Sequence, residues 1–175
     1  MIKVERIYAL PEADILRLAA QSGAEGFRFL GRLREEWNSG LNRFVGPGEA
    51  LFGVFDGARL VAIGGVTRSS KLIGRLRRCY VDREYRRRGI GRTLVVSVLE
   101  HARHHFMWVQ LRTDTAIGDA FYCSLGFSRV CENPEVSHEI SLQLPNQSLE
   151  PTPKSVMHPA AQAARQPWAW LSIKR

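Results

Sequence analysis

The chain has few cysteines, no long apolar run and little acidic charge in its most basic segment. Its three cysteines, Cys79, Cys123 and Cys131, are odd in number and lack CxxC spacing, which argues against a disulfide framework or a zinc site. No apolar run approaches the roughly 20 residues that a membrane-spanning helix needs. Charges interrupt the first ten residues, so we expect no secretory signal. These absences predict a cytoplasmic protein that binds neither a membrane nor a metal.

What the chain does have is concentrated positive charge. Ten lysine and arginine residues, opposed by two acidic residues, lie between Arg68 and Arg92, so this stretch accounts for the whole net charge of +8. A cationic stretch of this kind raises the local concentration of anions. A charge run alone is typical of a solvated surface, but "RRRGIGR" also contains Gly89 and Gly91. The glycines favour a specific anion site.

Strand and helix patterns alternate along the chain. Apolar periodicity predicts one strand followed by two helices, and Asp56-Gly57 then predicts a hairpin. After the hairpin we expect a strand, a helix and a strand that form a right-handed crossover. One helix and two strands complete the domain. The expected strands cover 2–9, 50–55, 59–66, 72–81, 106–111, 128–131 and 137–144, and the expected helices 11–20, 24–37, 89–102 and 116–125. "FMWVQL" is almost wholly apolar, so we expect it to be buried on both faces.

Domain organisation follows from a change in composition. Residues 1–144 are enough for one domain with a real core. The segment 145–175 holds five of the eight prolines and little periodicity, which predicts a tail and not a second domain.

Three phosphate-binding motifs compete for the basic glycine stretch. A P-loop requires G-x-x-x-x-G-K-[ST], which is absent, and a dinucleotide fold requires a third glycine where this chain has Leu94. The stretch fits R-x-x-G-x-G, with Arg86, Gly89 and Gly91. A helix that begins at Gly89 offers unpaired N–H groups and its positive dipole end to a diphosphate.

This motif resembles the coenzyme A site of the GNAT superfamily of acetyl-coenzyme A-dependent N-acetyltransferases. "CYVDREYRRRGIGRTLV" is similar to that family's central strand and loop, and "DAFYCSLGF" to its later helix with a tyrosine. The resemblance covers residues 1–144. It implies an α/β fold with a mixed, mostly antiparallel sheet, a parallel central strand pair and flanking helices.

The resemblance also implies site residues. The diphosphate of acetyl-coenzyme A would be held by the loop and the start of its helix, and Val81 and Tyr122 would serve both binding and catalysis. Val81 would lie where the central strand parts from its parallel neighbour and polarise the thioester carbonyl, and Tyr122 would protonate the departing thiolate. The residues expected to bind the donor are Val81, Arg86, Arg87, Arg88, Gly89, Ile90, Gly91, Arg92, Thr93, Thr115 and Tyr122.

Two departures affect the acceptor half of the site. Many members of the family carry a glutamate base where this chain has Arg75, and an asparagine where it has Thr115. Carboxylates on the second helix segment, Glu25, Glu35 and Glu36, are candidate bases, but surface carboxylates are the simpler interpretation of all three.

Three histidines and one cysteine are further candidate functional residues. His101, His104 and His105 have metal-ligand spacing, but no HExxH glutamate accompanies them, and cations are favoured at a helix C-terminus in any case. Cys123 adjoins Tyr122 but has no evident base, so we expect it to pack.

The sequence thus predicts an N-acetyltransferase that acts on a primary amine by direct attack, as a monomer or homodimer. A non-catalytic acyl-coenzyme A-binding regulator is one alternative. A nucleic-acid-binding module is another, although stacking aromatics near the arginines are few. The acceptor could be a small amine, an antibiotic, a peptide N-terminus or a lysine.

Overall fold

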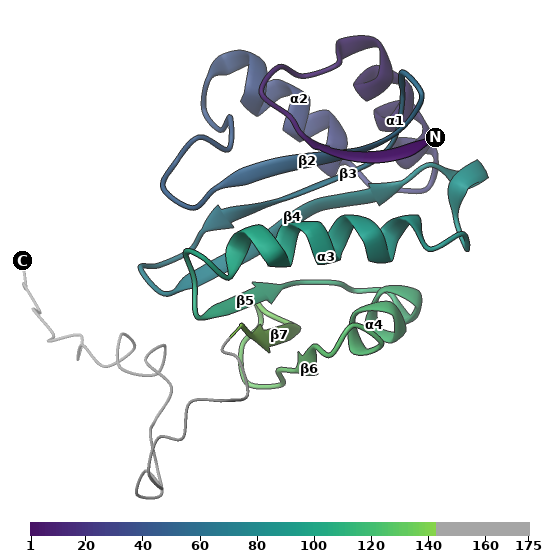
Figure 1. Ribbon diagram of the computed structural model, residues 1–175. Coiled ribbons are helices and arrows are strands. Elements are labelled where there is room, and N and C mark those ends of the chain that lie inside the picture. Colours follow the sequence, from purple (N-terminus) through teal and green to yellow (C-terminus); the bar gives the residue numbers. More distant parts are fainter. Residues whose placement is uncertain (143–175) are drawn as a thin grey trace, which may run out of the picture. The chain divides into compact units, whose positions relative to one another are not determined.

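The computed structural model describes residues 1–142 (Figure 1), and the tail predicted over 145–175 lies outside the described residues. A seven-stranded sheet carries four α-helices and one short 3-10 helix. In chain order the elements are β1 (Ile2–Arg6), α1 (Glu12–Ala24), α2 (Phe29–Ser39), β2 (Ala50–Asp56), β3 (Arg59–Arg68), β4 (Ile73–Val81), η1 (Arg83–Tyr85), α3 (Ile90–Ala102), β5 (Trp108–Leu111), α4 (Ala116–Cys123), β6 (Ser128–Arg129) and β7 (His138–Ser141).

The sheet is antiparallel except at its centre. Its strand order is β1-β2-β3-β4-β5-β7-β6, and β4 pairs with β5 in parallel because α3 crosses between them. The Asp56-Gly57 turn joins β2 to β3 as predicted, with Gly57 at φ 60°. The predicted mixed sheet with one parallel central pair is therefore confirmed.

Each face of the sheet has its own apolar core. One core lies under α3, whose predicted apolar face is buried at Ile90, Leu94, Val95, Val98 and Ala102. The other lies under α1 and α2 and includes Leu30, Leu33 and Trp37, as expected. The sheet thus separates an α3 face from an α1/α2 face, and Figure 1 shows α3 on the opposite side of the strands from α1 and α2.

The parallel pair opens soon after it begins. β4 and β5 pair only over Ile73–Arg75 and Trp108–Gln110. Beyond that point β4 continues to Val81, paired with β3 but no longer with β5. A gap therefore opens between the two central strands, and the free edge of β4 lines one side of it.

Several element boundaries differ from the sequence prediction. The first strand ends at residue 6 and not 9, and the last helix and the last two strands are shorter than predicted. The first helix runs on to Ala24, and the second begins only at Phe29, because Gly26 takes a left-handed φ of 88° that ends the first helix. Phe27 lies in the intervening turn and is only half-buried. The predicted fifth strand is shorter than expected, because β5 covers only Trp108–Leu111. It is also less buried than expected, since Trp108 is 39% exposed.

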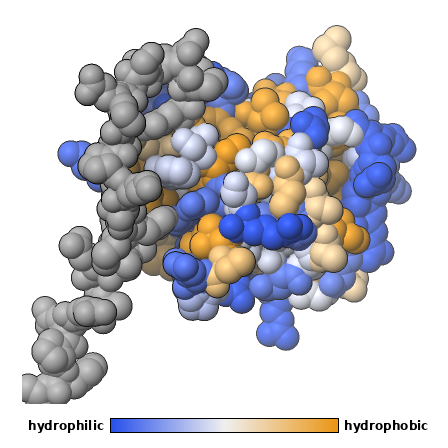
Figure 2. Space-filling view, turned by 90° about the horizontal axis from the view of Figure 1, so that it is seen from below, coloured by the Kyte–Doolittle hydropathy of each residue, from blue (hydrophilic) through white to orange (hydrophobic). Residues whose placement is uncertain are grey.

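Hydrophilic and hydrophobic residues are both present on the face of the molecule shown in Figure 2. The face seen from below, on the side of α4 and β6, shows hydrophilic and hydrophobic residues interspersed outside the grey atoms (Figure 2). Among the described residues, no helix combines the length and apolar character needed to cross a membrane.

Candidate active site

The basic loop joins β4 to α3 and exposes a row of main-chain donors. Arg87 and Gly89 take positive φ angles of 62° and 79°, and Gly89 is the N-cap of α3. Within the described residues, the six N–H groups from Arg87 to Arg92 have no hydrogen-bond acceptor. Unpaired donors at the positive end of a helix dipole fit a diphosphate.

The two loop glycines have different roles. A Cβ on Gly89 would meet no atom within 4 Å, so its positive φ is the constraint there. A Cβ on Gly91 would lie 3.4 Å from Phe121 and from Val81, which is ordinary van der Waals contact. The first turn of α3 therefore packs against both α4 and the end of β4 at this position.

The arginine side chains of the loop are partly committed to the protein. The guanidinium of Arg86 donates to the Val81 carbonyl at 3.0 Å and to both Glu25 oxygens at 3.0 and 2.8 Å, and it lies over the Tyr80 ring. Arg88 lies over the Tyr85 ring. Arg86 therefore ties the loop to α1 instead of pointing into the row of free N–H groups.

Two of the three candidate bases are held in ion pairs. Burial alone would raise the pKa of Glu25, but hydrogen bonds from Arg86 and Arg83 lower it below its usual value. Glu36 accepts two 2.7 Å hydrogen bonds from Arg78. A carboxylate stabilised in its charged form is a weak base, so Glu25 is poorly suited to deprotonate an amine, and both oxygens of Glu36 are bound to Arg78.

The end of β4 places one N–H group toward the gap. Asp82 donates its N–H to the Val61 carbonyl on β3 at 2.8 Å. Donors alternate in direction along a strand, so the preceding N–H, that of Val81, faces away from β3. It lies on the gap side of β4, where no β5 pairing reaches it.

Asp82, which the sequence analysis did not single out, holds this strand end in place. Its carboxylate is fully buried and accepts hydrogen bonds from Arg17, Arg59, Gln21 and the N–H of Glu84. Burial opposes ionisation, but these donors lower the pKa of the carboxyl below its usual value. An aspartate at the end of a strand, one of only two acidic residues in a cationic stretch, was the available signal.

Tyr122 extends from α4 toward β4. Its ring packs against Phe121 and Phe127, at centroid distances of 5.1 and 5.6 Å, and its hydroxyl interacts with the Cys79 thiol. Burial raises the pKa of Tyr122 well above its usual value, and burial also raises the pKa of Cys79 to about 12. The phenol therefore keeps its proton at neutral pH, and the thiol beside it does not form a thiolate.

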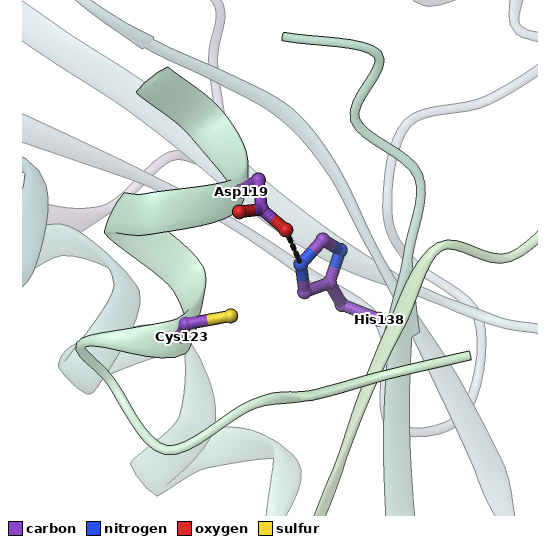
Figure 3. A group of neighbouring side chains, drawn as sticks. All are labelled: Asp119, Cys123 and His138. Atoms are coloured by element: carbon purple, nitrogen blue, oxygen red, sulfur yellow. Dashed lines mark hydrogen bonds and ion pairs between the residues drawn. The ribbon is translucent and has the colours of Figure 1, made fainter. Parts of the chain in front are cut away.

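A network of polar side chains anchors α4. Asp119, three residues before Tyr122, accepts two 2.6 Å hydrogen bonds from Arg129 and lies 3.1 Å from His138 Nε2 (Figure 3). Hydrogen bonds from Arg129 lower the pKa of Asp119 to about 2. Thr115 caps the helix by accepting from the N–H of Gly118 at 3.0 Å. These contacts fix the helix that presents Tyr122.

The same network includes a group that could hold a metal. Ligand atoms of Asp119, Cys123 and His138 lie within 4.8 Å of one another, which the cysteine spacing did not predict (Figure 3). The Arg129 guanidinium already forms a two-point ion pair with the Asp119 carboxylate, so a divalent cation would have to displace it.

A mixed sheet that is split at its parallel pair, with a helix N-terminus open to anions beside the split, defines a coenzyme A-dependent acyltransferase. The chain belongs to the Acetyltransferase (GNAT) family, whose pattern matches residues 14–127. It is therefore an acetyl-coenzyme A-dependent N-acetyltransferase, as the two sequence motifs predicted.

Known relatives agree with this assignment. The chain is 33% identical over 133 residues to the N-alpha-acetyltransferase RimI of Mycobacterium tuberculosis, covering 71% of this chain and 78% of the relative. An acetyltransferase structure from Exiguobacterium sp. 255-15 matches with a TM-score of 0.72 and 28% identity, over 81% of this chain and 93% of that one.

A third match shows the fold alone. The PaiA N-acetyltransferase from Thermoplasma acidophilum, solved in complex with coenzyme A, superposes with a TM-score of 0.63 at 16% identity, over 81% of this chain and 99% of that one.

Proposed function

We propose that this enzyme transfers the acetyl group of acetyl-coenzyme A to the α-amine of a polypeptide by direct attack of the amine on the thioester. The observation that carries the proposal is the Val81 N–H on the gap side of β4, on the strand that leads into the open loop and carries Cys79, with which the buried Tyr122 hydroxyl interacts. The RimI relative, named as an N-alpha-acetyltransferase, supports an α-amine as the acceptor.

Donor binding rests mainly on the main chain. The N–H groups from Arg87 to Arg92, which include those of Arg88, Gly89, Ile90 and Gly91, would hold the diphosphate. Thr93, in the first turn of α3, would lie near it. Arg86 contributes through its ion pair with Glu25, which braces the loop. Thr115 supports the site from the N-cap of α4. These residues orient the thioester toward the gap.

Two groups act on the reacting atoms. The Val81 N–H would donate to the thioester oxygen as negative charge develops there, which stabilises the transition state selectively. Arg86 donates to the Val81 carbonyl and so braces the peptide that follows Val81, at the end of the same strand. Tyr122 would give its proton to the departing thiolate, because its raised pKa keeps the phenol protonated.

Direct attack fits the cysteine chemistry better than an acyl-enzyme does. Cys79 is the thiol that interacts with the Tyr122 hydroxyl, but burial keeps it protonated, and the thiolate is the nucleophilic form. The candidate bases Glu25 and Glu36 are paired with arginines. In this proposal the acceptor therefore arrives as a free amine.

An acceptor panel tests this proposal. Free-thiol release from acetyl-coenzyme A should rise with a peptide that has a free N-terminal alanine. It should stay at the background level with the same peptide acetylated at its N-terminus, and with a blocked peptide that contains one lysine. Turnover confined to the lysine peptide, or to small amines, would overturn the α-amine assignment while leaving the acetyltransferase assignment intact.

A further inference from the structure

Arginines gather on the α1/α2 face of the central strand. In strand pairing, Arg77 lies opposite Gly65, and a Cβ on Gly65 would touch Phe44 in the core under α1 and α2. Residues directly opposite each other share a face, so Arg77 lies on this face. Arg75, two residues earlier, shares it. We call Arg32, Arg75, Arg77 and Arg78 the arginine cluster.

Arg78 connects this cluster to α2. It sits at a register shift between β3 and β4 and takes a left-handed φ of 62°, which a side chain of this size rarely adopts. Its guanidinium reaches Glu36 and the Phe29 carbonyl on α2. Arg32 lies one helical turn before Glu36, on the same face of α2.

Most of the positive charge in the cluster is not neutralised. Glu36 balances Arg78, but Arg75 donates to a main-chain carbonyl, that of Glu135, and not to a carboxylate. Within the described residues, the guanidinium groups of Arg32 and Arg77 have no hydrogen-bond partner. Partial burial and the charges of Arg75, Arg78 and Arg32 lower the pKa of Arg77, so these cations lie within electrostatic reach of one another.

The cluster lies at the entrance that remains open to an acceptor. The proposed donor loop and α4 lie with α3, so bound acetyl-coenzyme A would cover the α3 side of the gap. The acceptor must then reach the thioester from the α1/α2 side. β4 leaves β5 after Arg75, so Arg75 and Arg77 border the start of the gap on that side.

We infer that this enzyme selects polypeptide N-termini followed by acidic residues, whose carboxylates are bound by Arg32, Arg75 and Arg77. The inference rests on the proposed α-amine acetylation. Guanidinium groups bind carboxylates with charge-assisted hydrogen bonds. Arg32 and Arg77 are exposed, and among the described residues Arg75 is bonded to a main-chain carbonyl only, so all three can bind a carboxylate. Uncompensated cations would also favour the neutral form of a nearby amine. The same cluster would therefore recognise the acceptor and help keep its amine reactive without a carboxylate base.

A solvated basic surface is the simpler interpretation, but two features of Arg78 disfavour it. Its side chain is 8% exposed, and its Nε is a buried donor without an acceptor in the described chain. It also holds a strained backbone conformation. Arginines placed for solubility alone need neither feature.

Three matched peptides test the inference. Each begins with alanine and differs from the others only at its second to fourth residues, which are all glutamate, all serine or all arginine. The kcat/KM for the glutamate peptide should exceed that for the arginine peptide by about tenfold or more, mainly through KM. The advantage should shrink at about 0.5 M salt, where charges are strongly screened.

Point variants test whether the arginine cluster causes the preference for the glutamate peptide. Arg77→Glu should remove most of the preference for the glutamate peptide, measured within each variant as the ratio of kcat/KM for the glutamate peptide to that for the serine peptide, and Arg77→Lys should retain much of it. Lys3→Glu, on edge strand β1, makes the same change in net charge far from the gap and should leave the preference intact.

The outcomes separate the two proposals. Equal kcat/KM for all three peptides would overturn the acidic selectivity and leave α-amine acetylation standing. A preference that Arg77→Glu and Lys3→Glu reduce equally would also overturn it, because net charge and not the cluster would be responsible. Acetylation of none of the peptides, with coenzyme A still bound, would overturn the α-amine proposal and this inference with it.

Discussion

The donor half and the acceptor half of the site are built in different ways. The proposed donor half consists of consecutive main-chain N–H groups at the start of one helix, Arg87 to Arg92. The proposed acceptor half depends on side chains that meet only after folding, such as Arg78 on β4 and Glu36 on α2, 42 residues apart. A main-chain site leaves a local sequence motif, whereas a side-chain site of this kind leaves scattered residues.

The largest expected effect is on the donor half. Tyr122→Phe keeps the packed ring and removes the proton donor, so kcat should fall roughly 10²- to 10⁴-fold with little change in coenzyme A affinity. Tyr8→Phe, which alters an exposed tyrosine, is the control. Steady-state thiol release measures both variants. Wild-type turnover in Tyr122→Phe would remove this hydroxyl from the mechanism.

The second largest expected effect is on coenzyme A binding by the loop between β4 and α3. Gly89→Glu should weaken coenzyme A binding by about 100-fold or more, because it sets a carboxylate against the diphosphate. Gly57→Glu is a matched control, since Gly57 also has positive φ and no atom within 4 Å of a built Cβ, but lies in the β2–β3 turn. Calorimetric titration compares the two. Equal losses would mean that backbone strain, and not the anion site, explains the result.

The contrast between the halves also explains what the sequence could predict. The loop, the Asp56-Gly57 turn and the apolar face of α3 were predicted because each depends on neighbours in sequence. The side-chain role of Arg86 was missed, because its partner Glu25 lies 61 residues away. The start of α2 was misplaced because the left-handed turn at Gly26 depends on how α1 ends.

A third prediction concerns how the acceptor half is held. Glu36→Gln leaves the largely buried Arg78 without its carboxylate, and should lower the free energy of unfolding by about 2 kcal/mol. Glu100→Gln breaks a more exposed pair with Arg103 and should change it by less than about 0.5 kcal/mol. Urea denaturation measures both. Similar small effects would show that the Arg78–Glu36 pair does not anchor α2.

The smallest expected effect is a pH dependence. Arg129 and His138 hold the pKa of Asp119 at about 2, below its ordinary value of 3.8. This contribution to stability is present above pH 3.8 and is lost as the pH falls through 2. Asp119→Asn lacks the titration, so its urea midpoint should fall less than that of the wild type over this interval. Parallel curves would exclude Asp119 as a source of the acid sensitivity.

The central claim is that the acetyl group passes directly from acetyl-coenzyme A to an amine at the gap. Intact-protein mass spectrometry tests it after incubation with acetyl-coenzyme A, first alone and then with an alanine-terminated peptide. The account predicts an unmodified protein in both samples and a peptide that gains one acetyl group at its α-amine. An acetyl group on Cys79 or Cys123 that forms without the peptide and disappears as the peptide is acetylated would contradict it.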